Sequence, residues 1–393
     1  MRETLDVWPE LPIIVNIWND SRLIYPEDEG NIIAALEDHN RLCQISLSGL
    51  STPLLGRLAP MMQGPFPKLT SLHLGSDGDI AEVPSDAFSN GFAPRLQKLW
   101  LIDISFQKLP DLLSSTPDLT ELYLVGIPSS GYISPEVMTK CLSKLARLNC
   151  LRLEFHSPNP RPVRGIQGPP PLTRTTLPAL TVFIFRGVSE YLDDLVAQID
   201  APRLENIYIT FFNQLIFTIP HLQQFVGRTG NLQSPNRAAV LIDSAFVEII
   251  LYQPGTTPRS LTLRISCGKS DWQISSLVQV CGPFLPSLSS VEELEIRHFH
   301  YYRADWPADV DDDQWLEFFH PFTVVQILYV RRTVGPAVAL ALRNLTGERA
   351  TEVLPALRDI FVEGRQPYSP MCAAMESFLT ARRLSDHSDY PAL

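Results

Sequence analysis

Apolar residues recur along the chain in one spacing, Φ-x-x-Φ-x-Φ, where Φ is apolar and the last two apolar positions alternate with a variable one. Clear copies begin at residues 69, 96, 119, 148, 180 and 204, as in LTELYL at 119 and LENIYI at 204. Weaker copies begin at residues 42, 246, 291, 325 and 357. Alternation with period two is typical of a strand that buries one face. The pattern therefore predicts a series of similar strands.

The distances between these copies indicate a repeat architecture. From residue 42 to residue 204 the starts are 27, 27, 23, 29, 32 and 24 residues apart. A period of roughly 20 to 29 residues built on this motif is typical of leucine-rich repeats. Because one repeat cannot bury its apolar face alone, neighbouring repeats stack. We predict an α/β leucine-rich-repeat-like solenoid: a curved parallel sheet with helices or irregular arcs on the convex side. A βαβ sheet with leucine-rich strands is the alternative.

Two of the arcs between strands carry helical patterns. In SPEVMTKCLSKLARL, Ser134 is a predicted N-cap and Pro135 the first helical residue. The residues expected on the inward face of this helix are Val137, Cys141, Leu142 and Leu145. In SEYLDDLVAQID they are Leu192, Leu195, Val196 and Ile199. A strand and a helix in each repeat favour the α/β form of the solenoid.

The repeat pattern is interrupted twice and ends in a predicted cap. We expect one solenoid over residues 1–384 and a disordered tail over 385–393. Residues 157–178 are rich in proline and predict a disordered surface insertion. Over residues 213–290 the register blurs, and AAVLID, FVEIILYQP and SLTLRIS predict strands in quick succession. Residues 370–384 predict a capping helix, whose inward residues are Met371, Met375, Phe378 and Leu379.

Composition narrows the classes of function. The chain has 393 residues, more than the ~250 to 300 of a usual single core, which a solenoid can exceed because it grows along one axis. Its net charge of −11 argues against a nucleic-acid partner. No apolar run approaches ~18 residues, so no membrane span is predicted. Six cysteines without a C-x-x-C pair and without a signal segment favour an intracellular protein, cytoplasmic or nuclear.

The sequence offers no convincing catalytic or metal-binding constellation. CGKS at 267–270 resembles the end of a phosphate-binding loop, but Leu263 stands where that motif needs glycine. His298 and His300 lack a third ligand, and the acidic run at 309–313 lacks the glycine and glutamate of a calcium loop. We therefore expect no enzyme, no cofactor and no metal. A hydrolase within residues 213–290, using His221 or Asp243, remains an alternative.

The variable position between the last two apolar residues of each clear copy predicts a binding surface. Because side chains alternate across a strand, this position faces away from the core and forms a column across repeats. The column contains His73, Trp100, Tyr123, Arg152, Ile184 and Tyr208. The flanking columns supply a polar rim of Lys98, Glu121, Cys150, Arg186, Asn206 and Thr210. Exposed aromatic and arginine residues favour protein binding. The alternative is that the aromatic residues only stack on one another.

Several segments resemble a known family over nearly the whole chain. LDVWPELPIIV, NIIAALEDHNRLCQISL, LPALTVFIFRGVSEYLDDLVAQIDAPRLENIYITFFNQL, FHPFTVVQILYV and TEVLPALRDIFVE closely resemble the leucine-rich-repeat region of F-box proteins from mushroom-forming fungi. In that family the F-box binds the Skp adaptor of a cullin-type ubiquitin ligase, and the repeats are thought to select the substrate. The resemblance implies a substrate-recognition region that binds a protein substrate on the concave face.

Two features depart from that family. Only four residues precede Leu5, and no F-box motif is found there, so we expect Skp and cullin binding only if an F-box is supplied upstream. The asparagine that usually follows the strand is replaced at all six positions, by Asp77, Ile104, Ile127, His156, Val188 and Phe212. We expect apolar packing to hold these turns instead. A free-standing scaffold, or a small-molecule sensor with its site beneath the 157–178 loop, remains an alternative function.

Overall fold

The computed structural model describes most of the chain. Outside the described residues lie 1–10, 18–23, 25, 77, 85–92, 159–172, 213–216, 218, 244, 256–258, 267–272, 283–287, 299–311, 332–333, 344, 346–351, 364–372 and 381–393. The CGKS fragment, His300, most of the acidic run and the predicted tail fall in these segments. The chain divides into two compact units, residues 1–204 and residues 205–393. Each is described by itself.

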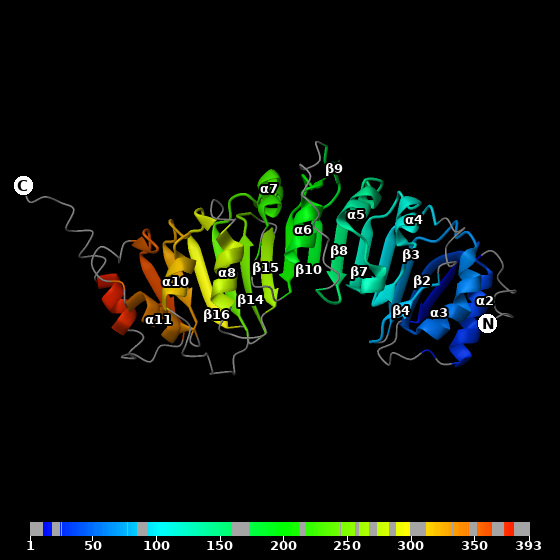
Figure 1. The fold of residues 1–393 in the computed structure, drawn as a ribbon, viewed down its shortest axis with the longest axis horizontal. Coiled ribbons are helices and arrows are strands. Elements are labelled where there is room, and N and C mark those ends of the chain that lie inside the picture. Colours follow the sequence, from blue (N-terminus) through cyan, green and yellow to red (C-terminus); the bar gives the residue numbers. More distant parts are fainter. Residues whose placement is uncertain are drawn as a thin grey trace, which may run out of the picture. The chain divides into compact units, whose positions relative to one another are not determined.

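The first unit contains a parallel sheet whose strands follow in chain order (Figure 1). In that order they are β1 (Ile13–Ile17), β2 (Leu42–Leu50), β3 (Ser71–Ser76), β5 (Lys98–Ile102), β7 (Glu121–Ile127), β8 (Cys150–Phe155) and β10 (Val182–Gly187). Every neighbouring pair is parallel. Five of the clear motif copies therefore form the strands that the spacing predicts.

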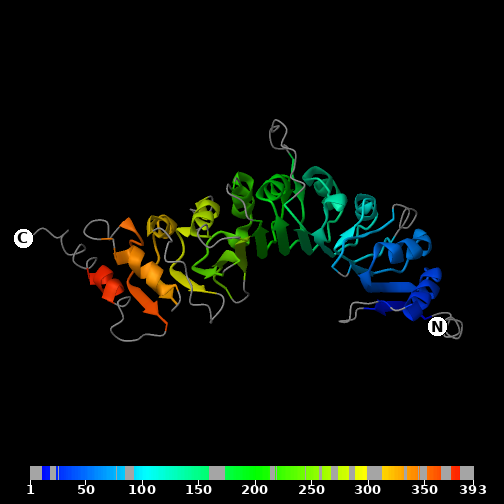
Figure 2. The same cartoon turned by 60° about the horizontal axis from the view of Figure 1, so that its bottom comes forward.

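Helices and short outer strands return the chain between the strands of the first unit. The helices are α2 (Pro26–Glu37), α3 (Thr52–Leu58), α4 (Leu109–Ser114), α5 (Pro135–Leu142) and α6 (Ser189–Val196), with 3-10 turns η1 (Ala59–Gln63) and η2 (Ser129–Gly131). The outer strands pair as β4 (Ala81–Glu82) with β6 (Ile104–Ser105) and β9 (Thr175–Thr176) with β11 (Ile199–Asp200). The helices cover one face of the sheet and leave the other open (Figure 2). We call the uncovered side the open face.

The second unit has the same layers but a different strand order. Its strands lie in the order β12 (Asn206–Phe211), β15 (Ser260–Ser266), β14 (Phe246–Tyr252), β13 (Arg237–Ile242), β16 (Glu293–His298), β17 (Ile327–Val330) and β18 (Asp359–Val362). β14 is antiparallel to both β13 and β15, and the other neighbouring pairs are parallel. The blurred register between residues 213 and 290 thus reflects two antiparallel turns, as the strands in quick succession predict.

The helices of the second unit are α7 (Pro220–Arg228), α8 (Gln273–Cys281), α10 (Asp312–Phe319) and α11 (Gly335–Arg343), with the 3-10 turn η3 (Gly230–Leu232). α10 packs between α8 and α11. It buries Trp315, Phe318 and Phe319. Residues 373–380 are helical and bury Met375 and Phe378, whereas the predicted inward residue Met371 lies outside the described part of the chain.

The consensus apolar residues form the core between sheet and helices. The closing pairs of most motifs are buried, and those of Leu122 with Leu124 and of Leu294 with Ile296 are at most 2% exposed. Burying a leucine side chain contributes ~1.5 to 3 kcal/mol. The arrangement of one buried strand face and one returning helix or arc in successive repeats confirms the predicted α/β leucine-rich-repeat-like fold.

One local prediction about the arcs needs correction. In α5, Ser134 caps the helix by accepting a hydrogen bond from the Val137 backbone N–H, as predicted. Val137 itself is 38% exposed, however, and Met138 is buried in its place. Residues 138, 141, 142 and 145 form one continuous stripe, whereas residue 137 lies about 100° around the helix from Met138, at the edge of that stripe. In α6 and the turn after it, all four predicted inward residues are buried.

The positions that replace the usual asparagine are mostly apolar and packed. Ile104, Val188 and Phe212 are buried, which agrees with turns held by apolar contacts. His156 is exposed instead, and its Nδ1 lies 3.9 Å from Asp103 Oδ1. Asp77 lies outside the described residues. Packing therefore replaces an internal hydrogen-bond ladder at three of these turns.

Candidate interaction surfaces on the open sheet faces

Five residues of the predicted column form one row on the open face of the first unit. His73 pairs with Trp100, Trp100 with Tyr123, Tyr123 with Arg152, and Arg152 with Ile184. Each of them is partly exposed and lies between two buried consensus residues of its strand. We call this row, His73, Trp100, Tyr123, Arg152 and Ile184, the first-unit stripe. The alternation of side chains places it as the sequence predicts.

The aromatic members of the stripe stack in sequence. The ring centroids of His73 and Trp100 are 4.3 Å apart with planes at 15°, and those of Trp100 and Tyr123 are 4.6 Å apart at 37°. Such contacts contribute about 0.5–1.5 kcal/mol beyond burial. Part of the aromatic surface therefore stabilises the sheet, as the stacking alternative predicts. The Trp100 indole Nε1 is buried and has no hydrogen-bond acceptor among the described residues, and an unsatisfied buried donor costs about 1–3 kcal/mol.

Polar contacts fix the stripe from both sides. Lys98 Nζ lies 2.8 Å from Glu121 Oε1 in the flanking row, and Arg152 Nε donates to Glu154 Oε1 at 2.7 Å. The Cys150 thiol donates a hydrogen bond to the Tyr123 hydroxyl, with Sγ and Oη 3.3 Å apart. These pairs hold the stripe side chains in defined positions, which lowers the entropic cost of binding a partner.

Burial keeps the titratable groups of the stripe neutral. Desolvation raises the pKa of Tyr123 well above its ordinary value, and the Cys150 contact adds to the increase. Desolvation, with the charge of Lys98, lowers the pKa of His73. Near neutral pH the aromatic row is thus uncharged. It offers flat apolar surface with Arg152 as a cation at one end.

The sixth predicted residue lies in the second unit. Tyr208 on β12 is 41% exposed and pairs with Thr262 on β15. Of the predicted rim, Lys98, Glu121, Asn206 and Thr210 are partly or largely exposed, and Arg186 is exposed. Cys150 is buried, because its thiol points at Tyr123, so it is not a rim residue.

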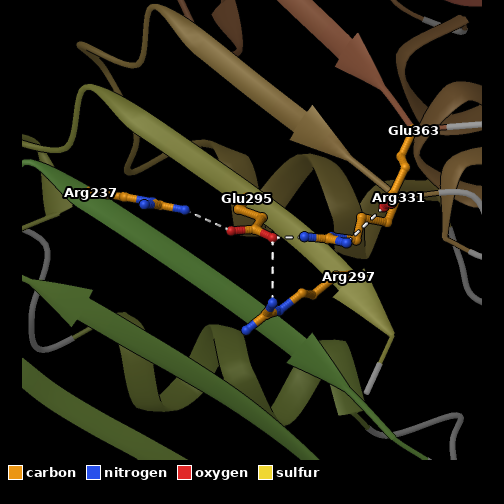
Figure 3. Close-up of polar contacts among 5 residues, drawn as sticks. All are labelled: Arg237, Glu295, Arg297, Arg331 and Glu363. Carbon is orange, nitrogen blue, oxygen red and sulfur yellow. Dashed lines mark hydrogen bonds and ion pairs between the residues drawn. The ribbon is translucent and has the colours of Figure 1, made fainter. Parts of the chain in front are cut away.

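The open face of the second unit carries a cluster of charges around Glu295 (Figure 3). Arg237 Nη2 donates to Glu295 Oε2 at 2.9 Å, and Arg331 Nε donates to Oε1 at 3.2 Å. Arg297 Nη1 lies 3.7 Å from the same Oε1. Burial alone raises the pKa of Glu295, but the hydrogen bond from Arg237 and the charges of Arg297 and Arg331 outweigh it, so the pKa is lowered. The carboxylate is ionised at neutral pH.

A pocket of about 600 Å³ opens beside this cluster. It is lined by Arg237, Glu293, Glu295, Tyr329, Val330, Arg331, Phe361, Val362 and Glu363, and we call it the arginine pocket. Tyr329 and Phe361 stack on its floor with ring centroids 5.2 Å apart and planes at 18°. Arg331 Nη1 also lies 2.8 Å from Glu363 Oε2. The pocket therefore combines an aromatic platform with fixed guanidinium groups.

The sequence contained the signal for this second site. The variable position that yields the first-unit stripe falls, in the weaker copies at 291, 325 and 357, on Glu295, Tyr329 and Phe361. These three residues pair directly across β16, β17 and β18. Reading the column only in the clear copies missed them. Arg237 could not be found in this way, because β13 follows no copy of the motif.

Among the described residues, no group of three or more His, Cys, Asp or Glu side chains could hold a metal ion. Asp243 Oδ1 accepts the Ala245 backbone N–H at 3.1 Å and shapes the turn between β13 and β14. A cavity behind β5 and β7, lined by Leu101, Leu124 and other apolar residues, has a volume of about 10 Å³, room for about one water.

Comparisons with known proteins give no family. No family model matches the chain, and no curated protein matches it. Among solved structures, the leucine-rich repeat-containing protein LegL7 from Legionella pneumophila is similar over 90% of this chain and 92% of its own, with 13% sequence identity and a TM-score of 0.29. The fold assignment rests on the strand order and registers of the chain itself. Within the described residues, no helix is long and apolar enough to cross a membrane.

Proposed function

We propose that this chain is a protein-binding repeat domain that holds a segment of a partner on its open sheet face, with the first-unit stripe as one contact surface. The observation that carries the proposal is the row from His73 to Ile184, which combines stacked aromatic rings with an arginine at fixed positions. Aromatic residues and arginine are the types that dominate binding energy in protein interfaces.

Two properties of the stripe support binding over a purely structural role. Its residues are partly exposed although they could be replaced by shorter polar residues without loss of the core, which lies on the opposite strand face. Ion pairs of Arg152 with Glu154 and of the flanking Lys98 with Glu121 preorganise it.

The finer form of the proposal is a substrate receptor for a ubiquitin ligase. It is supported by the sequence resemblance to the repeat region of fungal F-box proteins, and it predicts that a partner bound to the stripe is a ligase substrate. The chain would join the Skp adaptor and a cullin only through an F-box supplied upstream. A free-standing scaffold uses the same surface without the ligase, so the two forms differ in the proteins that accompany the partner.

The test compares partner recovery by the tagged chain with recovery by Trp100→Ala/Tyr123→Ala. Affinity purification from native extract with quantitative mass spectrometry should give partners that the double variant loses by tenfold or more. Val137→Ala removes an exposed apolar side chain from α5, on the helix side, and should lose none of them. Circular dichroism must show that the double variant is folded at the assay temperature.

A second variant keeps the test decisive if alanine weakens the sheet. Arg152→Gln leaves the stacked rings in place but removes the cation of the stripe, so it should fold like the wild type and still bind less. Equal partner recovery by the wild type and both folded variants would contradict the proposal. When an F-box is fused upstream of the chain, ubiquitylation of a recovered partner would support the ligase form, and binding without ubiquitylation would support the scaffold.

A further inference from the structure

We propose that the arginine pocket of the second unit is a second binding site, which takes a carboxylate of an acidic peptide segment onto Arg331 and Arg237 while an apolar or aromatic neighbour packs on Tyr329 and Phe361. The inference extends the proposed protein-binding function, but it rests on residues outside the first-unit stripe. It can therefore fail or succeed independently.

Glu295 acts as an internal anchor for the two binding arginines. Its side chain is only 9% exposed, while those of Arg237 and Arg331 are 49% and 34% exposed. Arg237 contacts Glu295 through Nη2 and Arg331 through Nε, and a guanidinium has five N–H donors in a fixed fork. The buried carboxylate thus orients both groups while their outer edges line the pocket.

Arg297 neutralises the negative charge of Glu295, which would otherwise repel an anionic ligand. Its Nη1 reaches Glu295 from outside the pocket lining, so three guanidinium groups surround one carboxylate (Figure 3). Its buried Nε has no hydrogen-bond partner among the described residues. Arg297 therefore balances Glu295, and Arg237 and Arg331 retain attraction for another anion. Arg297 is a positioning residue in this scheme.

The contact with Glu363 shows that Arg331 can bind a carboxylate. Its carboxylate lies 2.8 Å from Arg331 Nη1, and the side chain is 51% exposed at the end of the last described strand. Exposed ion pairs of this kind contribute about 0–1 kcal/mol. A ligand carboxylate can therefore displace Glu363 at small cost. We infer that Glu363 occupies the site in the free protein and competes with the ligand.

The rest of the pocket favours a peptide over a free small anion. Phe361 is 48% exposed and stacked on Tyr329, which forms an apolar floor beside the arginines. A volume of about 600 Å³ exceeds the needs of a single carboxylate. The lining holds two arginines and three glutamates, a net charge of −1 that Arg297, outside the lining, brings to zero. Glu293 is the cross-strand partner of Arg237 and lies two residues from Glu295 on β16, away from Glu363. Selectivity for a carboxylate then comes from the positions of the arginines and not from the net charge of the pocket.

The test measures fluorescence anisotropy of labelled peptides Gly-Gly-Phe-X-Phe-Gly-Gly on the full chain, with X as Glu, Gln, Lys or phosphoserine. The Glu peptide should bind roughly tenfold more tightly than the Gln and Lys peptides, as expected for one charge-assisted contact. Arg331→Gln should remove this preference. Arg147→Gln, an exposed arginine of the first unit paired with Asp118, should leave it unchanged.

Two further variants distinguish displacement of Glu363 by the ligand from the general effect of removing a negative charge from the pocket. Glu363→Gln should tighten binding of the Glu peptide, whereas Glu293→Gln, which removes the same charge from the same pocket, should change it much less. Trp100→Ala/Tyr123→Ala should bind the peptides normally, so loss of the first-unit function would not be mistaken for loss of this site.

Several outcomes would overturn the inference. They are equal binding of the Glu and Gln peptides, a preference for the Lys peptide, equal tightening by the two glutamine variants, and unchanged binding by Arg331→Gln. Binding of the phosphoserine peptide alone would replace the carboxylate site by a phosphate site. Each of the first four results would leave the charge cluster as a purely structural network.

Discussion

The carboxylate of Asp103 occupies the space that a β-carbon on Gly126 would need. Gly126 has a positive φ of 66° and lies where β7 and β8 shift register between Leu124 and Ile127. Asp103, which also has a positive φ of 54°, donates its backbone N–H to Val125 O at 2.8 Å. A bulge in one repeat is therefore built around the turn of the preceding repeat. Only glycine satisfies both the backbone conformation and the close approach.

Gly126→Ala should destabilise the first unit. The new methyl group would collide with Asp103, and the left-handed backbone disfavours any β-carbon, so we expect a loss of about 1–3 kcal/mol. Urea denaturation followed by circular dichroism measures the change. Gly56→Ala is the matched control, because Gly56 lies in α3 with open space around it. It should be neutral or stabilising by up to about 1 kcal/mol. Equal effects of the two variants would contradict this account.

Ser134→Ala should remove the N-cap of α5. The Ser134 hydroxyl accepts the Val137 N–H at 3.4 Å, and an Ala substitution at such a position costs about 0.5–2 kcal/mol. The long contact favours the lower half of that range. Thermal unfolding measures the loss, and Ser134→Asp should restore most of it. If the aspartate variant is as unstable as the alanine variant, the cap is not the cause.

Glu295→Gln should destabilise the second unit and alter its response to acid. Three arginines would lose their shared carboxylate, for an expected cost of about 1–3 kcal/mol at neutral pH. Because the pKa of Glu295 is lower in the folded state, its stabilisation is complete above the ordinary glutamate pKa and is lost as pH falls through the folded value. The difference in unfolding free energy between wild type and variant should shrink below about pH 4.

The half-exposed Glu363 provides the comparison for that experiment. Glu363→Gln should change the unfolding free energy by less than about 0.5 kcal/mol, since its pair with Arg331 faces solvent. A loss as large as that of Glu295→Gln would show that the outer pair, and not the buried carboxylate, holds the cluster together.

Cys281 should make the second unit sensitive to alkali. Burial at the end of α8 raises the pKa of its thiol to about 12, so the folded state keeps a proton that the unfolded chain releases near pH 9. Folding stability therefore falls as pH rises above about 9, by roughly 1.4 kcal/mol per pH unit for this group. The difference in unfolding free energy between wild type and Cys281→Ala should shrink from pH 8 to 11. A constant difference would contradict the prediction.

The sequence predicted the repeating part of the fold because its signal is local. Leucines at the closing positions, as in Leu122 and Leu124, fix both the strand and the face that it buries. Ser134 and Pro135 likewise indicate where α5 begins. The Trp100 to Tyr123 register follows from equal positions in successive motifs. These features need only spacing and alternation.

The rest depends on contacts between residues far apart in the chain. The order β12, β15, β14, β13 could not be read from spacing, because the second of two antiparallel turns returns the chain beside β12. The ion pair between Arg237 and Glu295 follows from that strand order, because the order places β13 next to β16. By contrast, Gly49 and Gly126, each within a strand segment and at positive φ, were readable hints of the two bulges.

The hairpin strands of the second unit bear on how the domain is assembled during synthesis. In the first unit each new strand can dock on the one made just before it. β13, when it is made, must instead leave a gap beside β12 wide enough for β14 and β15, which do not yet exist. Addition of strands to the sheet therefore stops at β12 until the segment of about sixty residues from β12 to the end of β15 has been synthesised. Deleting β14 and β15 would leave β12 without its neighbouring strand in the second unit.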